Sequence, residues 1–426
     1  MYSAKKLVKR IPFFYGWVAI AIAGLGYFFT GPGQTYSFSL FIDHFIEDFG
    51  WSRVLVNSLY SIASLISGLS MFLVGRYVDK KGAKRVMLIA ALLLAASMFW
   101  FSFLSSTFML FVGFLIGRFS GQSSLMLATG TVAPRWFVKK RGLAIMLVSL
   151  GGTAGNMVFP KLNAYLIETL GWQTAFGALG IFVLVVFVPL CAIFMINKPE
   201  DVGEHPDGIA DVDHEEEHLE EVEKDHATSL TQGETLRTVV FWLMFVSATQ
   251  YSMIGTGIGL NYVSIFNAGG IADLNFITTM MSLAPLIGLA AMLTSGLYIN
   301  KLKKPQILLA VISVMIAISF VVLANLSSRA GAIVYMILNG LTMSMFFLMH
   351  DVIKPYMFGR RFIGSVSGVF LVAWSGGSAL GPVLFGLAFE MFGGYKEILM
   401  VLALLPFVTG VLLLFIKRPK KRRGNL

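Results

Sequence analysis

The sequence predicts an all-α polytopic membrane protein with twelve transmembrane helices, and three observations support this fold class. The chain of 426 residues is 56% hydrophobic and only 13% charged, whereas soluble domains carry about 25% charged residues. Its apolar residues fall in long blocks, and its basic residues gather on alternate connections between the blocks. Composition and patterning therefore both indicate a chain that lies in a bilayer.

Twelve apolar blocks are long enough to cross a bilayer, because the hydrocarbon core requires about 20 residues of helix. Transmembrane strands would show short alternating segments instead. The basic start "KKLVKR" resembles that of a signal peptide, but the block after it is too long and lacks a small-residue cleavage site, so we expect a retained first helix. The blocks are 13–36, 54–74, 86–105, 107–132, 142–160, 174–196, 240–262, 276–299, 306–325, 330–349, 364–386 and 398–416.

The distribution of positive charge predicts the orientation of the chain. The even-numbered connections and both termini hold 28 of the 33 Lys and Arg residues, while the other connections hold only Arg53, Lys161, Arg329 and Lys396. Basic residues stay on the cytoplasmic side, so we expect a multi-pass protein of the plasma (inner) membrane with both termini in the cytoplasm. The net charge of +10 then reflects topology and attraction to anionic lipid, and no nucleic-acid partner is predicted.

A long polar segment divides the blocks into six and six. Residues 197–236 contain the acidic run "DVDHEEEHLEEVEKDH" and few large apolar residues, which is typical of a flexible linker. We therefore predict a six-helix bundle over 1–196, an acidic cytoplasmic linker over 197–236, and a second six-helix bundle with a basic cytoplasmic tail over 237–426.

The two halves resemble each other. "GRYVDKKGAKRVMLIAALL" follows the second block and "GLYINKLKKPQILLAVI" follows the eighth, while "GGTAGN" in the fifth block matches "GGSALGP" in the eleventh. Internal repeats of this kind mark secondary transporters, whose substrate site lies near the bilayer midplane.

These motifs resemble those of the major facilitator superfamily. "GRYVDKKGAKR" is similar to its loop 2–3 signature, Arg118 with Gly121 is similar to its helix 4 motif, and the two glycine motifs are similar to those of its helices 5 and 11. The resemblance covers essentially the whole chain. It implies two pseudo-symmetric six-helix bundles and a transporter rather than an enzyme. It also implies a small-molecule substrate and, as is usual for the fold, a monomer.

Shorter motifs resemble the branch with monocarboxylate carriers and the oxalate–formate exchanger, namely "FYGW", "FGWSR", "RWFVKKRGLA", "KPEDVG" and "FW" at the start of the seventh block. Those carriers place an arginine in helix 8, and the exchanger adds a lysine in helix 11. Blocks 276–299 and 364–386 of this chain contain neither Lys nor Arg. A dicarboxylate substrate is therefore not expected.

Arg118 is the only charged residue inside the twelve blocks, and none of them contains Asp or Glu. A charge in the bilayer centre costs about 2.5–3.5 kcal/mol on insertion scales and usually faces a cavity or a partner. Two interpretations follow. Backbone carbonyls and polar neighbours such as Gln122 satisfy the guanidinium, which then organises the first bundle. Alternatively, its counter-ion is the substrate, a small carboxylate held by the guanidinium fork.

Other polar residues are candidate substrate contacts, with interhelical hydrogen bonding as the alternative role. All of them except Gln34 lie at similar depths in their blocks. Helices 1, 4, 7 and 10 line the cavity in superfamily members, which favours the candidates on those helices. "GPG" at 31–33 is expected to weaken the first helix. The predicted substrate-binding set is Arg118, Tyr27, Gln34, Gln122, Asn156, Gln250, Tyr251, Asn339 and Trp374.

The resemblance also implies a cytoplasmic gate. The aspartate of the loop 2–3 signature, here Asp79, latches that side in the superfamily through nearby basic residues, and ordinary interfacial solvation is the alternative. The predicted gating set is Asp79, Arg85, Arg135, His350 and Asp351.

The sequence thus predicts a secondary active transporter that works by alternating access on a small organic monoanion, with a proton as candidate coupling ion. An exporter of apolar or cationic compounds and a non-transporting membrane sensor are the alternatives. No cofactor or metal is predicted, because no P-loop occurs and the zinc-protease pattern "HEEEH" lies in the acidic run, without the helical context it needs.

Overall fold

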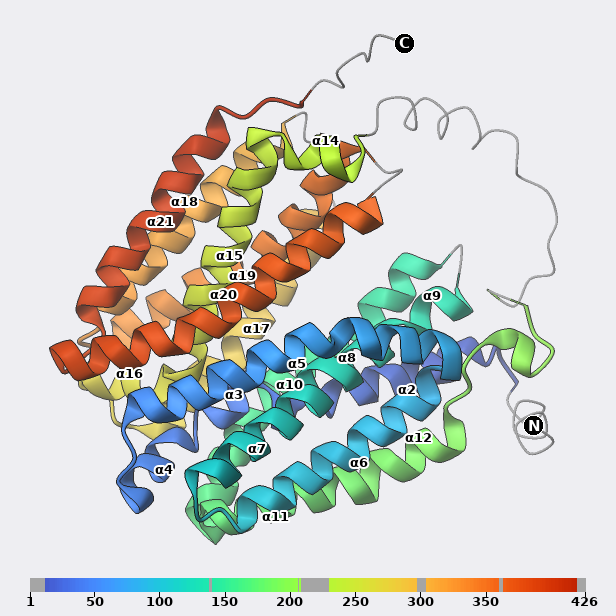
Figure 1. The fold of residues 1–426 in the computed structure, drawn as a ribbon, viewed down its shortest axis with the longest axis horizontal. Coiled ribbons are helices and arrows are strands. Elements are labelled where there is room, and N and C mark those ends of the chain that lie inside the picture. Colours follow the sequence, from blue (N-terminus) through green and yellow to red (C-terminus); the bar gives the residue numbers. More distant parts are fainter. Residues whose placement is uncertain are drawn as a thin grey trace. The chain divides into compact units, whose positions relative to one another are not determined.

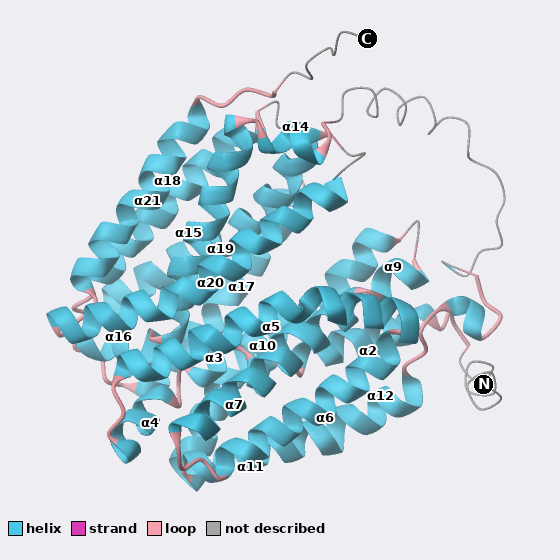
Figure 2. Ribbon diagram, in the orientation of Figure 1, coloured by secondary structure: helices cyan, strands magenta, loops and turns pink. Residues whose placement is uncertain are grey.

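The computed structural model describes residues 12–137, 140–205, 207, 230–296, 304–359 and 363–419. Helices make up nearly all of this described chain, which contains no strand (Figure 2). The all-α fold class is therefore confirmed. The predictions that concern the acidic run at 208–229, the first residues and the end of the basic tail lie outside the described residues.

The chain divides into two compact units. Unit 1 comprises Met1–Asp211 and Leu274–Ser282, and unit 2 comprises Val212–Asp273 and Leu283–Leu426. The division falls inside the segment expected to be the acidic linker. Because most of that segment lies outside the described residues, the linker itself stays a prediction.

Unit 1 consists of a series of helices and short helical turns (Figure 1). Two stretches, η2 and η3, are π-helices, and η1 is a 3₁₀ turn. In chain order the elements are α2 (Gly16–Phe28), η1 (Gly31–Gly33), α3 (Thr35–Phe38), α4 (Ile42–Phe49), α5 (Arg53–Lys81), α6 (Ala83–Ser102), α7 (Thr107–Gly117), η2 (Arg118–Leu125), α8 (Met126–Gly130), α9 (Val132–Trp136), α10 (Arg141–Leu170), α11 (Trp172–Phe182), η3 (Val183–Phe187), α12 (Val188–Phe194) and the 3₁₀ turn η4 (Pro199–Asp201).

Unit 2 contains mostly long helices (Figure 1). One of them, α17, begins in the short stretch that is grouped with unit 1. In chain order the elements are α14 (Gln232–Leu236), α15 (Val239–Leu260), α16 (Tyr262–Ala268), α17 (Leu274–Gly296), α18 (Pro305–Ala324), α19 (Arg329–Phe358), α20 (Ile363–Phe392) and α21 (Lys396–Leu414).

Eleven helices of the described chain are long and apolar enough to cross a bilayer. The remaining predicted span, 13–36, is broken, as its "GPG" sequence predicts. Regular helix α2 ends at Phe28, and Gly31–Gly33 form a 3₁₀ turn before α3 begins at Thr35. Proline lacks the amide hydrogen that a continuous helix needs. The twelve predicted spans therefore correspond to eleven helices of spanning length and one interrupted helix.

The repeated glycine motifs serve the same packing role in both units. In unit 1 a Cβ atom on Gly151 of α10 would lie 1.8 Å from the carbonyl oxygen of Gly24 in α2. In unit 2 a Cβ atom on Gly381 of α20 would lie 1.9 Å from the carbonyl oxygen of Met253 in α15. Small residues allow helix backbones to approach closely where lipid provides no hydrophobic drive. The two motifs thus bring one pair of helices in each unit into close backbone contact.

A cluster of aromatic rings surrounds α4 in unit 1. The Phe176 side chain is fully buried, and its ring stacks on Phe41 with centroids 3.9 Å apart and on Phe101 with centroids 4.7 Å apart. Trp172 packs on Phe45 and donates its indole N–H to Asp48 at 2.7 Å. This α4 aromatic cluster therefore packs the connection between the first two spans against α6 and α11.

Candidate functional site

Arg118 is held inside unit 1 by neutral groups. It begins η2, and its side chain is only 2% exposed. Nε donates a hydrogen bond to Ser64 Oγ at 3.0 Å, and Nη1 donates to Thr35 Oγ1 at 3.3 Å. The guanidinium carbon lies 4.8 Å from the centroid of the Tyr60 ring, within cation–π range. No carboxylate pairs with Arg118 in the described part of the chain.

Two of the groups that surround Arg118, Tyr60 and Ser64, belong to a hydroxyl seam on α5. Tyr60, Ser64 and Ser67 follow one another at helical spacing, so their side chains share one face of α5. The Tyr60 and Thr35 hydroxyls lie 2.7 Å apart, and the Ser67 and Ser123 hydroxyls lie 2.6 Å apart. The seam therefore provides one acceptor directly, Ser64, and its Tyr60 hydroxyl lies beside the second acceptor, Thr35. Its signal in the sequence was the spacing of polar residues in "YSIASLIS".

The local backbone explains how Arg118 reaches Thr35. A Cβ atom on Gly33 would lie 2.6 Å from the carbonyl oxygen of Gly117, and one on Gly121 would lie 3.0 Å from Gly33 Cα. Only glycine permits η1 and η2 to approach so closely, and this contact brings the start of α3 beside Arg118. The wide turn at Arg118 is itself a π-helix, a feature that occurs frequently at functional sites.

Gln122 does not contact Arg118 as the first interpretation expected. Its Oε1 atom is buried without a hydrogen-bond partner among the described residues, while Ser64 and Thr35 accept from the guanidinium instead. A π-turn spaces residues by about one more position than an α-turn. The π-turn therefore places Gln122, four residues beyond Arg118, away from the position that an α-helix would give it.

Three other predicted residues of unit 1 lie on α2, on α10 and between η1 and α3. Tyr27 packs over Gly152, whose Cβ atom would lie 2.8 Å from the tyrosine ring. Asn156 Nδ2 donates to the carbonyl oxygen of Gly152 at 3.4 Å, and Gln34 Nε2 donates to Thr30 Oγ1 at 3.2 Å. All three make local contacts, and none is hydrogen-bonded to Arg118.

In unit 2 the structure brings Tyr251, Trp374 and His350 together. Tyr251 of α15 stacks on Phe346 of α19 at 4.2 Å, and its ring lies 5.9 Å from Trp374 of α20. His350 lies 4.8 Å from Phe346 and 5.9 Å from Trp374. Two predicted substrate contacts and one predicted gating residue therefore share one aromatic cluster, which the separate sequence motifs did not reveal.

The other predicted polar residues of unit 2 lie apart from this aromatic cluster. Gln250 is 5% exposed and donates to Thr409 Oγ1 of α21 at 2.6 Å, which is an interhelical hydrogen bond. Asn339 is half-buried on α19, where its carbonyl oxygen accepts from Thr342 at 3.3 Å.

Of the predicted gating residues in unit 1, Arg135 is the one with a defined contact. Its Nη2 atom donates to the carbonyl oxygen of Val78 at 3.5 Å, one residue before Asp79. Arg85 is exposed. The side chains of Asp79 and Asp351 lie outside the described residues.

In the segment after α12, two side chains accept hydrogen bonds from backbone amides at the starts of helices in unit 1. Asn197 Oδ1 accepts from the backbone amide of Lys84 at 2.9 Å, and Asp207 Oδ1 accepts from that of Lys140 at 3.1 Å. Both amides lie at the beginning of a helix, where they lack intrahelical partners. Burial raises the pKa of Glu204 in the same segment, and a hydrogen bond from the Tyr15 backbone opposes that rise.

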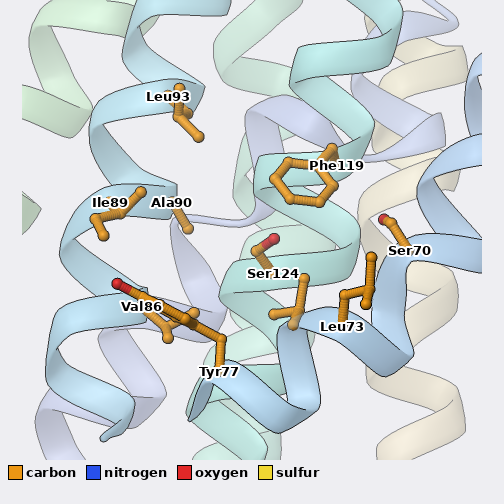
Figure 3. A pocket seen from close by; sticks show the side chains of 10 residues that line it. Ser70, Leu73, Tyr77, Val86, Ile89, Ala90, Leu93, Phe119 and Ser124 are labelled. Carbon is orange, nitrogen blue, oxygen red and sulfur yellow. The ribbon is translucent and has the colours of Figure 1, made fainter. Parts of the chain in front are cut away.

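A separate cavity of about 290 Å³ lies between α5, α6 and η2 (Figure 3). Its wall is apolar apart from three hydroxyls and contains no charged side chain, so it provides no counter-charge for an ion. Leu73 and Ile89 at its rim are exposed, whereas Ala90 and Ser124 are buried. The lining residues are Ser70, Leu73, Val74, Tyr77, Val86, Ile89, Ala90, Leu93, Phe119 and Ser124.

Several curated proteins resemble this chain in sequence. An uncharacterized MFS-type transporter of Bacillus subtilis, YcxA, is 24% identical over 170 residues, which cover 39% of this chain and 41% of that protein. Human monocarboxylate transporter 6 is 29% identical over 180 residues, which cover 39% and 33%. Another uncharacterized MFS-type transporter, YhjX of Escherichia coli, is 24% identical over 262 residues, which cover 60% of each chain. The matches thus span one third to three fifths of these relatives.

Solved structures share the fold over nearly the whole chain. A D-xylose–proton symporter superposes with a TM-score of 0.71 at 16% identity and covers 97% of this chain and 100% of its own. A peptide transporter in complex with sulfate also gives 0.71, at 11% identity and 93% coverage of both chains. The sequence model of the Major Facilitator Superfamily matches residues 16–382. This match confirms the family that the motifs suggested: the protein belongs to the Major Facilitator Superfamily and is a transporter, not an enzyme.

Proposed function

We propose that this transporter is secondary active, works by alternating access, and moves a small organic monoanion that Arg118 binds. The observation that carries the proposal is a buried guanidinium whose recorded partners are two hydroxyls and one aromatic ring. Neutral oxygens satisfy hydrogen bonds but leave the charge uncompensated. A substrate carboxylate would supply both the missing charge and a bidentate partner.

The number of charges favours a monoanion. Arg118 is the only charged residue in the predicted spans, so a second carboxylate would enter the bilayer without a partner, at a high energetic cost. The similarity to human monocarboxylate transporter 6 supports the same substrate class. The predicted spans contain no Asp or Glu side chain that could carry a proton. We therefore propose that any coupled proton is transported together with the substrate.

We also propose that Asp79 and Arg135 form part of a cytoplasmic latch, together with Arg85 and Asp351. The contact between Arg135 and the carbonyl oxygen of Val78 supports this role, because it places a cation beside the loop 2–3 signature.

Uptake by proteoliposomes tests the role of Arg118. Purified wild-type protein, Arg118→Gln and Arg118→Lys would be assayed with radiolabelled acetate, propionate and lactate. We expect saturable uptake by the wild type and a loss of about 10- to 100-fold in kcat/KM for Arg118→Gln, which corresponds to about 1.4–2.7 kcal/mol. Arg118→Lys keeps the charge but not the planar fork and should retain an intermediate rate.

Arg329→Gln is the matched control for this experiment. Arg329 is 65% exposed and pairs with Asp273 at 2.8 Å, and such surface ion pairs contribute only about 0–1 kcal/mol. Its uptake should equal that of the wild type. Saturable anion uptake that survives Arg118→Gln, in protein whose thermal unfolding is normal, would refute the proposed role of Arg118.

We propose, as a second candidate function, the export of apolar or cationic compounds, and the apolar cavity supports the export of the apolar ones. A wall without charged side chains suits an apolar ligand. Flux of ethidium without flux of any carboxylate would favour this second function over the first.

A further inference from the structure

Ser124 lines the cavity between α5, α6 and η2, and its hydroxyl has no hydrogen-bond partner in the described part of the chain. The side chain is 4% exposed, and the Oγ atom itself is buried. The other two serines of η2 have partners, because Ser120 Oγ donates to the carbonyl oxygen of Ile116 at 2.6 Å and Ser123 Oγ donates to that of Ser67 at 3.1 Å. An unpaired buried hydroxyl is destabilising. The exception at Ser124 therefore points to a ligand.

The unpaired hydroxyl faces the cavity. Figure 3 shows the Ser124 oxygen within the ring of lining side chains, on the side of Phe119. Of the two other hydroxyls in the wall, that of Ser70 already donates to the carbonyl oxygen of Ser67 at 2.6 Å. A buried water makes about three hydrogen bonds, and cavities with apolar walls stay dry. The cavity therefore suits an apolar molecule better than water.

The cavity opens on the surface of unit 1 between α5 and α6. Leu73 is 56% exposed and Ile89 is 43% exposed. Both residues lie inside the predicted spans 54–74 and 86–105, so the opening lies at the depth of the bilayer. The Tyr77 ring extends from α5 toward α6 across one end of the cavity (Figure 3). A ligand that dissolves in the bilayer could thus enter without crossing an aqueous phase.

The volume and the wall of the cavity limit the ligand. The volume of about 290 Å³ is roughly twice that of an engineered apolar cavity that binds benzene, so a molecule of about ten non-hydrogen atoms fits. Apart from its three hydroxyls the wall consists of apolar side chains, and none of the lining residues is charged. An ion would lose its hydration there without gaining a counter-charge. The ligand should therefore be neutral.

The depth of Ser124 excludes a phospholipid as the hydrogen-bond partner. Helical residues Thr107–Trp136 form one candidate span, and Arg135 is the next charged residue after Ser124. About 16 Å of helix separates the two residues at the usual rise, which is half of the hydrocarbon core of a bilayer. The oxygen atoms of a phospholipid stay outside this core. Only a smaller molecule brings a polar group to the level of Ser124.

We propose that this cavity binds a neutral, bilayer-soluble alcohol, with its hydroxyl hydrogen-bonded to Ser124 and its apolar chain directed toward the opening at Leu73 and Ile89. A serine hydroxyl both donates and accepts, so it matches the hydroxyl of an alcohol. The inference concerns binding by unit 1 alone. It names a class of ligand for the cavity, and it requires neither that the alcohol be transported nor that Arg118 bind an anion.

Photolabelling in detergent tests the proposal. Purified wild-type protein would be irradiated with an octanol that carries a diazirine on its chain, and the labelled residues would be located by mass spectrometry. We expect labelling in α5, α6 and η2 that excess 1-octanol suppresses. Octane lacks the hydroxyl and should need an about fivefold higher mole fraction in the micelle for half suppression, because it lacks one hydrogen bond. Octanoate at pH 8 should not suppress the labelling, because it is charged.

Two substitutions in the wall and one control locate the site. Ser124→Ala should bring 1-octanol and octane within about twofold of each other, and its melting temperature should equal or exceed that of the wild type because an unpaired buried hydroxyl is removed. Ser120→Ala makes the same change in the same π-helix and should keep the fivefold difference, because Ser120 bonds to its own helix. Ala90→Leu, at a wall position that is 1% exposed, would fill the cavity and should abolish the suppressible labelling.

Labelling that spreads over the exposed apolar faces and resists 1-octanol would mean partition into the micelle only, and it would overturn the inference. A fivefold preference for 1-octanol that persists in Ser124→Ala would overturn it as well. If Ser124→Ala does not fold, Ala90→Leu decides, because unchanged labelling in that variant refutes the site and lost labelling supports it. Failure of the proposed transport functions would appear instead in proteoliposome flux, which this binding measurement does not use.

Discussion

Gly381→Ala is expected to destabilise the protein by about 3 kcal/mol or more, although it adds only one methyl group. The new Cβ atom would lie 1.9 Å from the carbonyl oxygen of Met253 and 2.9 Å from the backbone nitrogen of Gly257. Both obstacles are backbone atoms of α15, so no rotation of a side chain relieves the overlap. Helices α15 and α20 would have to separate, which is a severe form of overpacking.

The separation would also weaken hydrogen bonds between the two helices. Ser252 Oγ donates to the carbonyl oxygen of Trp374 at 2.6 Å, and the Thr256 and Ser378 hydroxyls lie 3.0 Å apart. We therefore expect a large fall in the melting temperature and in the monodisperse fraction on size-exclusion chromatography in detergent.

Gly376→Ala is the matched control on the same helix. A Cβ atom on Gly376 would meet nothing within 4 Å, and alanine exceeds glycine in helix propensity by up to about 1 kcal/mol. The control should be neutral or slightly stabilising, so the two substitutions should differ in sign. Equal melting temperatures for the two variants would show that the close approach of α15 and α20 does not limit stability.

Phe176→Ala is expected to cost about 3–5 kcal/mol, the range for truncation of a buried phenylalanine. Phe176 is the centre of the α4 aromatic cluster, where its ring contacts Phe41 and Phe101 closely and Trp172 at 6.4 Å. Its removal would leave a cavity that these rings line on several sides. The neighbouring rings are rigid and cannot fill such a space well, so most of the van der Waals contacts of the Phe176 ring should not be replaced.

Two measurements test this expectation. The melting temperature of Phe176→Ala should fall well below that of Phe103→Ala, because Phe103 is 76% exposed and its truncation creates no cavity. Limited proteolysis should then detect the loosened connection that contains α4. A melting temperature for Phe176→Ala within error of the wild-type value would disprove the role assigned to the cluster.

The sequence predicted the features that depend on composition and pattern, and missed those that depend on side-chain partners. Apolar blocks and basic connections predicted the all-α membrane fold, and "GPG" predicted the break in the first span. Arg118 was recognised as an isolated charge. Its partners Ser64 and Thr35 were missed, because serine and threonine are common in membrane helices and carry little signal individually.

His350 shows why position along a helix is insufficient. Counting residues placed it near the predicted inner end of α19, which suggested a gate. The structure buries its ring among Phe346, Phe370 and Trp374, and its role in a gate stays a prediction. Two of these rings come from α20, and no spacing within one helix predicts which neighbour faces it. The same limit applies to Gln250, whose partner Thr409 lies 159 positions away.

The π-helix η2 has a consequence for insertions and deletions. A π-turn amounts to an α-helix with one additional residue, whereas removal of a residue from a regular helix rotates everything beyond it by about 100°. A one-residue deletion within Arg118–Leu125 could therefore convert η2 to α-helix and leave α8 and α9 in their present orientation. When single residues are deleted in turn from Thr107 to Trp136, the deletions within η2 should give folded protein most often. The span should therefore lose a residue in this segment with the smallest loss of stability.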